Sequence, residues 1–226
     1  MTDSTFIKPD YQTEDETKAG NYFVSNYPPF SFWNDDDVPC VNSLVNSPSP
    51  GTAPLGLYYH VPFCRKRCHF CYFKVYTDKN SGDVRRYLSA TMKELKVYAE
   101  SPYFRGRKPK FVYFGGGTPS YLSNKDFELI FHSLKENFNF NQNIEISIEV
   151  NPKDINLEKV SLYEDLGINR ISIGGQSFDD NILKTLGRNH NSIELINSLN
   201  LLKNKDFNNI NLDLIYGVPG QSIETW

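Results

Sequence analysis

Four cysteines are too few for a disulfide scaffold in a chain of 226 residues, and three of them crowd into eight positions, as metal ligands do. Cys64, Cys68 and Cys71 form a C-x3-C-x2-C pattern. Three soft thiolates at this spacing suit an iron–sulfur cluster. Because a cubane cluster has four irons, three protein ligands leave one iron open to a chelating small molecule. The pattern therefore predicts a four-iron, four-sulfur (4Fe-4S) cluster with one open position.

Zinc is the main alternative for these thiols, with His60 or His69 as the fourth ligand. Zinc sites usually pair two cysteines with a distant second pair, so the spacing favours the iron–sulfur cluster. The basic run Arg65–Arg67 lies between the thiols, where we expect it to lower their pKa and to offset the negative charge of the cluster. Cys40 stands apart in a Pro/Asn/Ser-rich stretch and is interpreted as an incidental thiol outside the site.

A glycine run, Gly115–Gly117, precedes Thr118 and Pro119 and follows an apolar segment. Residues without a Cβ let a ligand approach the backbone closely and expose amide donors. We therefore expect this run to bind the amino-acid end of a nucleoside ligand.

From residue 55 onward, short apolar runs alternate with helical periodicity, the pattern of parallel strands joined by crossover helices. The predicted strands cover about residues 55–61, 110–114, 144–150, 169–173 and 209–215. Helices are predicted between Gly82 and Pro102, from a capping box at Ser123 to about residue 136, and over 156–166. Each chemically interesting motif follows a strand, where parallel α/β folds place their chemistry. Periodicity alone leaves a barrel and an open doubly wound sheet as alternatives.

The expected organisation is an irregular N-terminal arm over residues 1–54, rich in proline from Pro28 to Pro54, and a core over residues 55–226. The core stops at Gly217–Gln221 and the apparent start of a fifth helix. We expect the last strand of a six-unit barrel to be missing and the chain to be a C-terminally incomplete fragment.

Composition narrows the class of partner. With 39% hydrophobic and 14% aromatic residues the chain can bury a sizeable core, and a net charge of -3 argues against a general nucleic-acid binder. Its start lacks the pattern of a secretory signal, and no stretch reaches the roughly 18 apolar residues of a membrane span. These features favour a cytoplasmic protein with a small-molecule partner.

Six motifs occur here in one order: C-x3-C-x-F-C, GGGTP, IEVNP, GGQSF, LGRNH and DLIYGVPGQ. Over residues 55–226 the sequence resembles the radical S-adenosylmethionine (radical SAM) superfamily, in the branch of oxygen-independent coproporphyrinogen III oxidase. The resemblance implies an α/β fold, a partial (β/α)6 TIM-like barrel truncated before its last strand, with the cluster at its top.

The resemblance also implies binding residues for two S-adenosylmethionine molecules. Tyr58 and Phe70 match aromatic positions around the first molecule, Gly116 a backbone contact to its methionine part, and Glu149 an acidic contact to it. The contacts of the second molecule match Gly117, Thr118, Gln176, Arg188, Asp213 and Ile215. No catalytic side chain is assigned.

The function implied is reductive cleavage of S-adenosylmethionine to a 5'-deoxyadenosyl radical, followed by oxidative decarboxylation of porphyrinogen propionates in heme biosynthesis. Flavodoxin or ferredoxin would be the electron donor. One position departs from the oxidase pattern: Phe73 stands where these oxidases usually carry a further cysteine. A radical SAM methylase and a non-catalytic heme chaperone therefore remain alternatives.

Overall fold

The structure is a computed structural model that describes residues 34–49, 51 and 53–226. The chain divides between Ser43 and Leu44 into two units. The larger unit, Leu44–Trp226, contains every strand of the described residues. Most of the predicted N-terminal arm lies outside the described residues.

Within the described part of the predicted arm, residues 35–45 are helical, which differs from the sequence-based expectation, whereas residues 46–49, 51, 53 and 54 contain no helix or strand. A 3-10 turn, η2 (Asp35–Asp37), is followed directly by helix α1 (Val38–Val45). Pro39 is compatible with this helix because it stands in the first turn, where backbone N–H groups have no intrahelical acceptor. Prolines therefore limit the length of this helix and do not prevent it.

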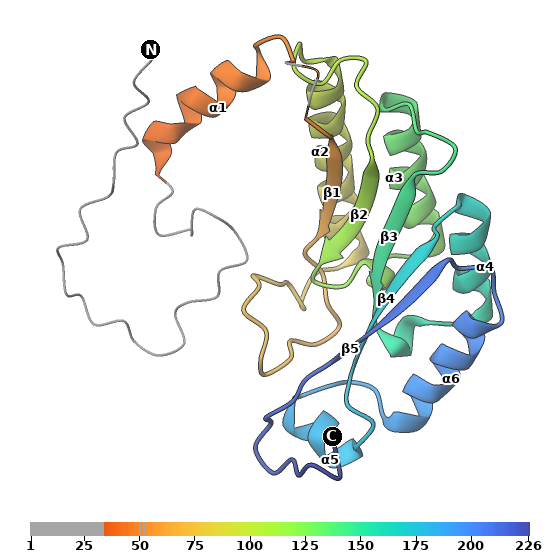
Figure 1. Ribbon diagram of the computed structural model, residues 1–226. Helices are drawn as coiled ribbons and strands as arrows, with labels where there is room; N and C mark the ends of the chain where they lie inside the picture. The colour runs from red at the N-terminus through yellow and green to blue at the C-terminus, as the bar shows by residue number, and fades with distance from the viewer. Residues whose placement is uncertain (1–33, 50, 52) are drawn as a thin grey trace, which may run out of the picture. The chain divides into compact units, whose positions relative to one another are not determined.

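Five parallel strands form one sheet in the order β1-β2-β3-β4-β5, the same as their order in the chain (Figure 1). They are β1 (Gly56–Val61), β2 (Phe111–Gly116), β3 (Glu145–Val150), β4 (Arg170–Gln176) and β5 (Asn209–Leu214). All five match the predicted strands, although β2 and β4 run beyond their predicted ends at residues 114 and 173 into the glycines that follow. Sequential parallel strands are those of a barrel, so the α/β prediction of a partial TIM-like barrel is confirmed.

Four helices cover the convex face of this sheet (Figure 1): α2 (Ser81–Glu100), α3 (Asn124–Asn137), α4 (Leu157–Leu166) and α6 (Ser192–Lys203). A doubly wound sheet would carry helices on both faces. The predicted boundaries of α3 and α4 are confirmed by their caps. The Ser123 side chain accepts a hydrogen bond from the Asp126 N–H, and Gly167 ends α4 in a left-handed conformation with φ of 84°.

The apolar core lies between the sheet and these helices. Phe114 on β2 packs on Phe127 of α3 with ring centroids 5.0 Å apart, and Phe127 meets Tyr163 of α4 at 5.2 Å. Ile148 and Ile171 on the next strands are completely buried. Burial of such side chains stabilises the fold by roughly 1.5–3 kcal/mol each, which fixes the strands whose ends carry the site.

Short elements follow the carboxyl ends of three strands: η3 (Pro119–Tyr121) after β2, η4 (Pro152–Asp154) after β3 and α5 (Asp180–Thr185) after β4. After β5, the expected helix start is one turn, in which the Trp226 N–H donates to the Ser222 carbonyl at 3.1 Å. In the part of the chain that is described, no helix is long and apolar enough to cross a bilayer.

Candidate cluster and cofactor site

One cavity lies at the carboxyl ends of the strands. Of the thirteen residues predicted for the cluster and the cofactors, eleven line it: Cys64, Cys68, Phe70, Cys71, Gly116, Gly117, Thr118, Glu149, Gln176, Arg188 and Asp213. They come from the β1 loop and from the ends of β2, β3, β4 and β5, with the exception of Arg188, which follows α5. The fold therefore gathers motifs up to 149 positions apart, from Cys64 to Asp213, on one surface.

Cys64 is the most deeply placed of the three thiols. The loop that carries it closes on itself, since the Cys64 N–H donates to the Tyr76 carbonyl at 3.0 Å and the Tyr76 N–H to the Pro62 carbonyl at 2.9 Å. The Cys64 Sγ lies 3.3 Å from the Thr118 hydroxyl. Burial raises the pKa of the Cys64 thiol, and the hydrogen bond from Thr118 and the charge of Arg188 only partly oppose this effect.

The expectation that the basic run 65–67 lowers thiol pKa is therefore wrong for Cys64. Arg65 donates from Nε to a carboxylate oxygen of Asp154 at 2.7 Å, and Arg67 donates to the Cys71 carbonyl at 3.1 Å. Both guanidinium groups are bound to other partners, so the cation that favours the Cys64 thiolate is Arg188.

Arg188 links two parts of the site. Its Nη1 donates to the Cys68 Sγ at 3.1 Å, and its Nη2 donates to the Gly174 carbonyl at 2.7 Å. Its Nε is buried without a hydrogen-bond partner among the described residues. A buried donor without an acceptor is costly, and such groups are commonly retained where a ligand supplies the acceptor.

The two histidines of the zinc alternative have other partners. The His60 Nδ1 lies 3.0 Å from the Tyr58 hydroxyl, and its ring packs on Gly116, where a Cβ would come within 2.7 Å of the imidazole. The His69 Nδ1 lies 2.8 Å from the Thr185 carbonyl, at the end of α5. Neither histidine lines the cavity.

Glu149, near the end of β3, is held by two donors. The Tyr113 hydroxyl donates to Oε1 at 2.7 Å and the Gly116 N–H to Oε2 at 3.2 Å. Burial raises the pKa of Glu149, and the nearby carboxylate of Asp213 adds to that rise, whereas the two hydrogen bonds lower it. The carboxylate is thus oriented by Tyr113 and the glycine run while it faces the cavity.

Gln176 ends β4 in a strained conformation. Its φ of 71° makes it the one non-glycine residue with positive φ in the described ranges, and the pairing of β4 with β5 shifts register there. An L-residue with a side chain pays roughly 1–2 kcal/mol for this left-handed conformation. Strain at the edge of a cavity is typical of a residue whose side chain must point at a ligand.

Two predicted residues do not line the cavity. Tyr58 is exposed on β1, and partial burial, with the charge of Glu149, raises its pKa to about 12. Ile215 packs with Phe70 against a small apolar group formed by Ile182, Leu186 and Val218. Ile215 and Phe70 therefore pack on the same apolar group, and of the two Phe70 lines the cavity. Tyr58 lies close enough to Glu149 for the carboxylate charge to act on its hydroxyl.

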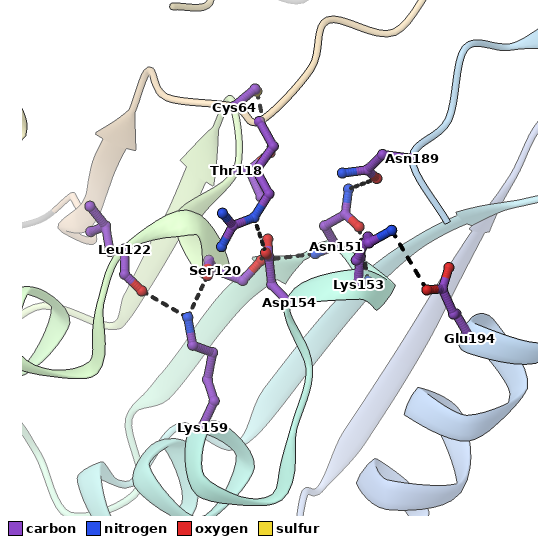
Figure 2. Close-up of polar contacts among 11 residues, drawn as sticks. Cys64, Thr118, Ser120, Leu122, Asn151, Lys153, Asp154, Lys159, Asn189 and Glu194 are labelled. Atoms are coloured by element: carbon purple, nitrogen blue, oxygen red, sulfur yellow. Dashed lines mark hydrogen bonds and ion pairs between the residues drawn. The ribbon is translucent and has the colours of Figure 1, made fainter. Parts of the chain in front are cut away.

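Sequence reasoning missed several polar residues of the cavity, namely Asn151, Asp154, Ser172 and Asn189, and also Tyr113, which orients Glu149. Asn151 and Asp154 follow Glu149 within one motif, and the Asn151 side chain donates to that of Asn189 at 3.1 Å (Figure 2). Because Asn151 and Asp154 closely follow Glu149 in the sequence, their position could have indicated that they belong to the site. Their inward orientation depends on the turn η4, which the sequence pattern did not indicate.

The residues present fit a 4Fe-4S cluster by two observations. The three thiols line the same cavity, and a Cβ on Gly117 would lie 3.0 Å from the Cys64 Sγ and 2.9 Å from the Phe63 carbonyl, so this wall requires glycine. Among the described residues no three His, Cys, Asp or Glu side chains converge on a single metal ion. Cubane thiolates bind separate irons and need not converge in that way.

Comparison with known proteins places the chain in a family. Residues 58–226 match the radical SAM superfamily. The chain belongs to the radical SAM superfamily. This superfamily implies a 4Fe-4S cluster and S-adenosylmethionine as cofactors, in agreement with the donor set of the cavity.

Two groups of curated relatives are equally similar to this radical SAM chain. The heme chaperone HemW of Buchnera aphidicola is 36% identical over 171 residues, which cover 76% of this chain and 45% of the relative. The oxygen-independent coproporphyrinogen III oxidase of Escherichia coli is 36% identical over 173 residues, covering 76% of this chain and 37% of the relative. The chain thus spans less than half the length of these relatives.

The solved structure of coproporphyrinogen III oxidase (HemN) from Escherichia coli has the same fold. It superposes with a TM-score of 0.78 at 33% identity, over 90% of this chain and 46% of that one. The resemblance predicted from the six motifs is confirmed by this similarity and by the curated relatives.

Proposed function

We propose that Cys64, Cys68 and Cys71 hold a 4Fe-4S cluster with which the whole protein cleaves S-adenosylmethionine reductively. The observation that carries this proposal is the meeting of the three thiols with Gly116 and Glu149 on one cavity. Binding of an unrelated ligand would not require three free thiols beside a glycine run and an oriented carboxylate.

When bound, the cluster supplies one electron to S-adenosylmethionine, which separates into methionine and a 5'-deoxyadenosyl radical. The chain positions the reactants and excludes water. Gly116 would let the methionine end approach its backbone, and its N–H, together with the Tyr113 hydroxyl, orients the Glu149 carboxylate. In this arrangement Glu149 would accept hydrogen bonds from the first cofactor molecule.

Two S-adenosylmethionine molecules are proposed, because a second set of polar groups lines the same cavity. Gln176, Arg188 and Asp213 come from β4, the segment after α5, and β5. The Arg188 Nε has no hydrogen-bond partner among the described residues and is proposed to bind a carboxylate. Asp213 is exposed and is proposed to bind ribose hydroxyls or to face the sulfonium charge. Thr118, which directly follows the glycine run, lines the same cavity and is proposed as a further contact of the second molecule.

The proposed substrate is a porphyrinogen, whose propionates are decarboxylated oxidatively in heme biosynthesis. Lys66 and Arg67 line the cavity and are exposed, so cations are available for an anionic substrate. A flavodoxin or ferredoxin is the proposed electron donor, since the cluster requires an external reductant.

A heme chaperone is the second candidate. Phe73, which lines the cavity and is 46% exposed, stands where the oxidases usually carry a further cysteine. The similarity to HemW proteins equals the similarity to the oxidases. Both observations favour heme binding without turnover as the alternative.

The deciding experiment uses the whole protein, reconstituted anaerobically. Incubation with coproporphyrinogen III, S-adenosylmethionine and a reductant should yield 5'-deoxyadenosine and protoporphyrinogen IX, detected by mass. Tight heme binding without 5'-deoxyadenosine would assign a chaperone. Formation of S-adenosylhomocysteine and a methylated product, without decarboxylation, would assign a methylase.

The second cofactor molecule is tested by calorimetry on the same protein. Arg188→Ala should weaken mainly one of two binding events, by roughly 1.5–3 kcal/mol, the usual contribution of hydrogen bonds to charged groups. Glu149→Gln should weaken mainly the other. A single binding event that Arg188→Ala leaves unchanged would contradict the two-molecule proposal.

A further inference from the structure

The loop Cys64–Cys71, called the cluster loop below, carries the three thiols. The Arg65 side chain extends from this loop to η4, the turn that follows β3. Arg65 lies between Cys64 and Cys68, and its Nε donates to Asp154 in η4 at 2.7 Å. The Arg65 guanidinium also lies over the Tyr121 ring, 5.4 Å from its centroid. The Arg65 side chain is 55% exposed, whereas that of Asp154 is 3% exposed. A surface residue of the loop is therefore anchored to a buried carboxylate.

The second oxygen of Asp154 binds η3. The Ser120 hydroxyl donates to it at 3.1 Å and accepts from the Asn151 N–H at 2.9 Å (Figure 2). Lys159 of α4 donates to the carbonyls of Ser120 and Leu122, the latter at 2.7 Å. Ser120 is thus held from three directions in a completely buried position.

These contacts form a closed ring that returns to a cluster ligand. Cys64 contacts the Thr118 hydroxyl at 3.3 Å, and Thr118 continues through Pro119 to Ser120. Ser120 binds Asp154, Asp154 binds Arg65, and Arg65 is the next residue after Cys64 in the chain. Figure 2 shows the Cys64, Thr118, Ser120 and Asp154 part of this ring. It joins the loops that follow β1, β2 and β3 at one point.

The ring depends on one buried charge. Removing Arg65 leaves the buried Asp154 carboxylate without this cation, which is costly, while the intact pair, with one largely exposed partner, contributes little net stability. Burial lowers the pKa of Lys159, which Asp154 opposes and Arg65 reinforces, so the three charges are coupled. Such an arrangement is better explained by the geometry it fixes than by the stability it adds.

We propose that Arg65 and Asp154 are positioning residues that fix Cys64 and the segment 117–118 relative to each other. This inference rests on the proposed function, in which Cys64 is a cluster ligand and the segment contacts a cofactor. Groups that orient metal ligands from behind typically change metal affinity or activity by roughly 10–100-fold when they are removed.

The first test uses the metal-free chain, so its outcome does not depend on cluster formation. Iodoacetamide labelling, read residue by residue by mass spectrometry, should modify Cys64 roughly ten-fold faster in Asp154→Asn and in Arg65→Met. The double variant should be no faster than either single variant, because both break the same contact. Arg65→Lys, which keeps the charge, should restore part of the protection.

A matched control is Glu164→Gln on α4. It removes another ion pair of the same length, from Lys205 Nζ to the Glu164 carboxylate at 2.7 Å, which has no contact with the cluster loop. Glu164→Gln should leave the Cys64 labelling rate unchanged. Arg65→Met guards against failure of the buried Asp154→Asn variant to fold, since the Arg65 side chain is largely exposed.

The second test uses the anaerobically reconstituted chain and measures iron release to a chelator. Release should be roughly ten-fold faster in Asp154→Asn and Arg65→Met than in the wild type, and unchanged in Glu164→Gln. If Cys64 labelling and iron release in both ring variants match the Glu164→Gln control, the positioning role is wrong although a cluster forms. If no cluster forms in the wild type while Cys64 labelling still depends on Asp154, the proposed function fails and the positioning of Cys64 stands.

Discussion

The middle of the sheet and its carboxyl-terminal edge are built from opposite kinds of residue. In the middle, Phe114, Ile148 and Ile171 are completely buried and apolar. At the edge, Glu149 directly follows Ile148, and burial raises the pKa of this carboxyl group. The strand β4 ends there in Gln176, which has a strained backbone. The middle stabilises the fold, whereas the edge costs stability. Unfavourable features concentrated at one edge indicate that the edge is kept for function.

The largest effect is expected when one thiol at the carboxyl-terminal edge of the sheet is removed. Cys64→Ala, Cys68→Ala or Cys71→Ala should each abolish the cluster while the metal-free fold persists, because the apolar core is untouched. The reconstituted wild type should contain about four irons per chain and show a broad absorption band at about 400 nm.

Cys40→Ala is the control, since Cys40 is an exposed residue of α1. It should keep the full iron content and absorption. Anaerobic purification that yields stoichiometric zinc and no cluster would overturn the iron–sulfur assignment.

The converse substitution removes a side chain from the middle. Phe127→Ala, in contact with Phe114 and Tyr163, should lower the free energy of unfolding by about 3–5 kcal/mol, as large cavities in a core do. Leu129→Ala on the same helix is the control, because Leu129 is exposed and should change stability by less than about 0.5 kcal/mol. Denaturant unfolding of the metal-free chain measures both. Equal effects would contradict the assignment of the core.

The edge also contains a buried histidine, His190, that should make the stability of the fold depend on pH. His190 is buried behind the edge, its Nε2 lies 3.0 Å from the Gly175 carbonyl, and its Nδ1 has no partner among the described residues. Burial, and then the charge of Arg188, lowers its pKa to about 4 from an ordinary 6.5, against smaller opposing effects that include Glu194. The folded chain therefore resists protonation of this imidazole.

Because the folded pKa of His190 is depressed, its contribution to stability is complete above pH 6.5 and is lost as the pH falls toward 4. The loss should be about 3 kcal/mol, at 1.36 kcal/mol for each pH unit. His190→Gln should remove this loss, and His132→Gln, at an exposed position of α3, should leave it unchanged. Identical pH profiles for His190→Gln and the wild type would show that the imidazole does not carry the effect.

The same contrast explains how far the sequence could predict the molecule. The middle follows periodicity, so all five strands and the caps at Ser123 and Gly167 were predicted from local pattern. The thiols and the glycine run were predicted because their residue types and spacing carry chemistry in the sequence itself, whereas Glu149 was predicted only through the resemblance to the family. Asp154 was missed, since its role depends on Arg65 at 2.7 Å, a partner 89 positions away. Pairings of this kind follow from the tertiary fold and leave no local pattern.

The smallest predicted effect concerns backbone strain at the edge. At Gln176, with φ of 71°, glycine adopts the required conformation without cost, whereas alanine retains the penalty of an L-residue. Both substitutions remove the same side-chain contacts, so their difference isolates the backbone. Gln176→Gly should therefore be more stable than Gln176→Ala by about 1 kcal/mol, measured by denaturant unfolding of the metal-free chain.

Ser172 supplies the control within the same strand. It lies in the middle of β4, and glycine in a strand interior is less stable than alanine by roughly 0.5–1 kcal/mol. The order of the two substitutions should therefore reverse between positions 172 and 176. The same order at both would show that Gln176 is not strained. Reversal with loss of cofactor binding in both Gln176 variants would show that the edge accepts a backbone cost in order to present this side chain.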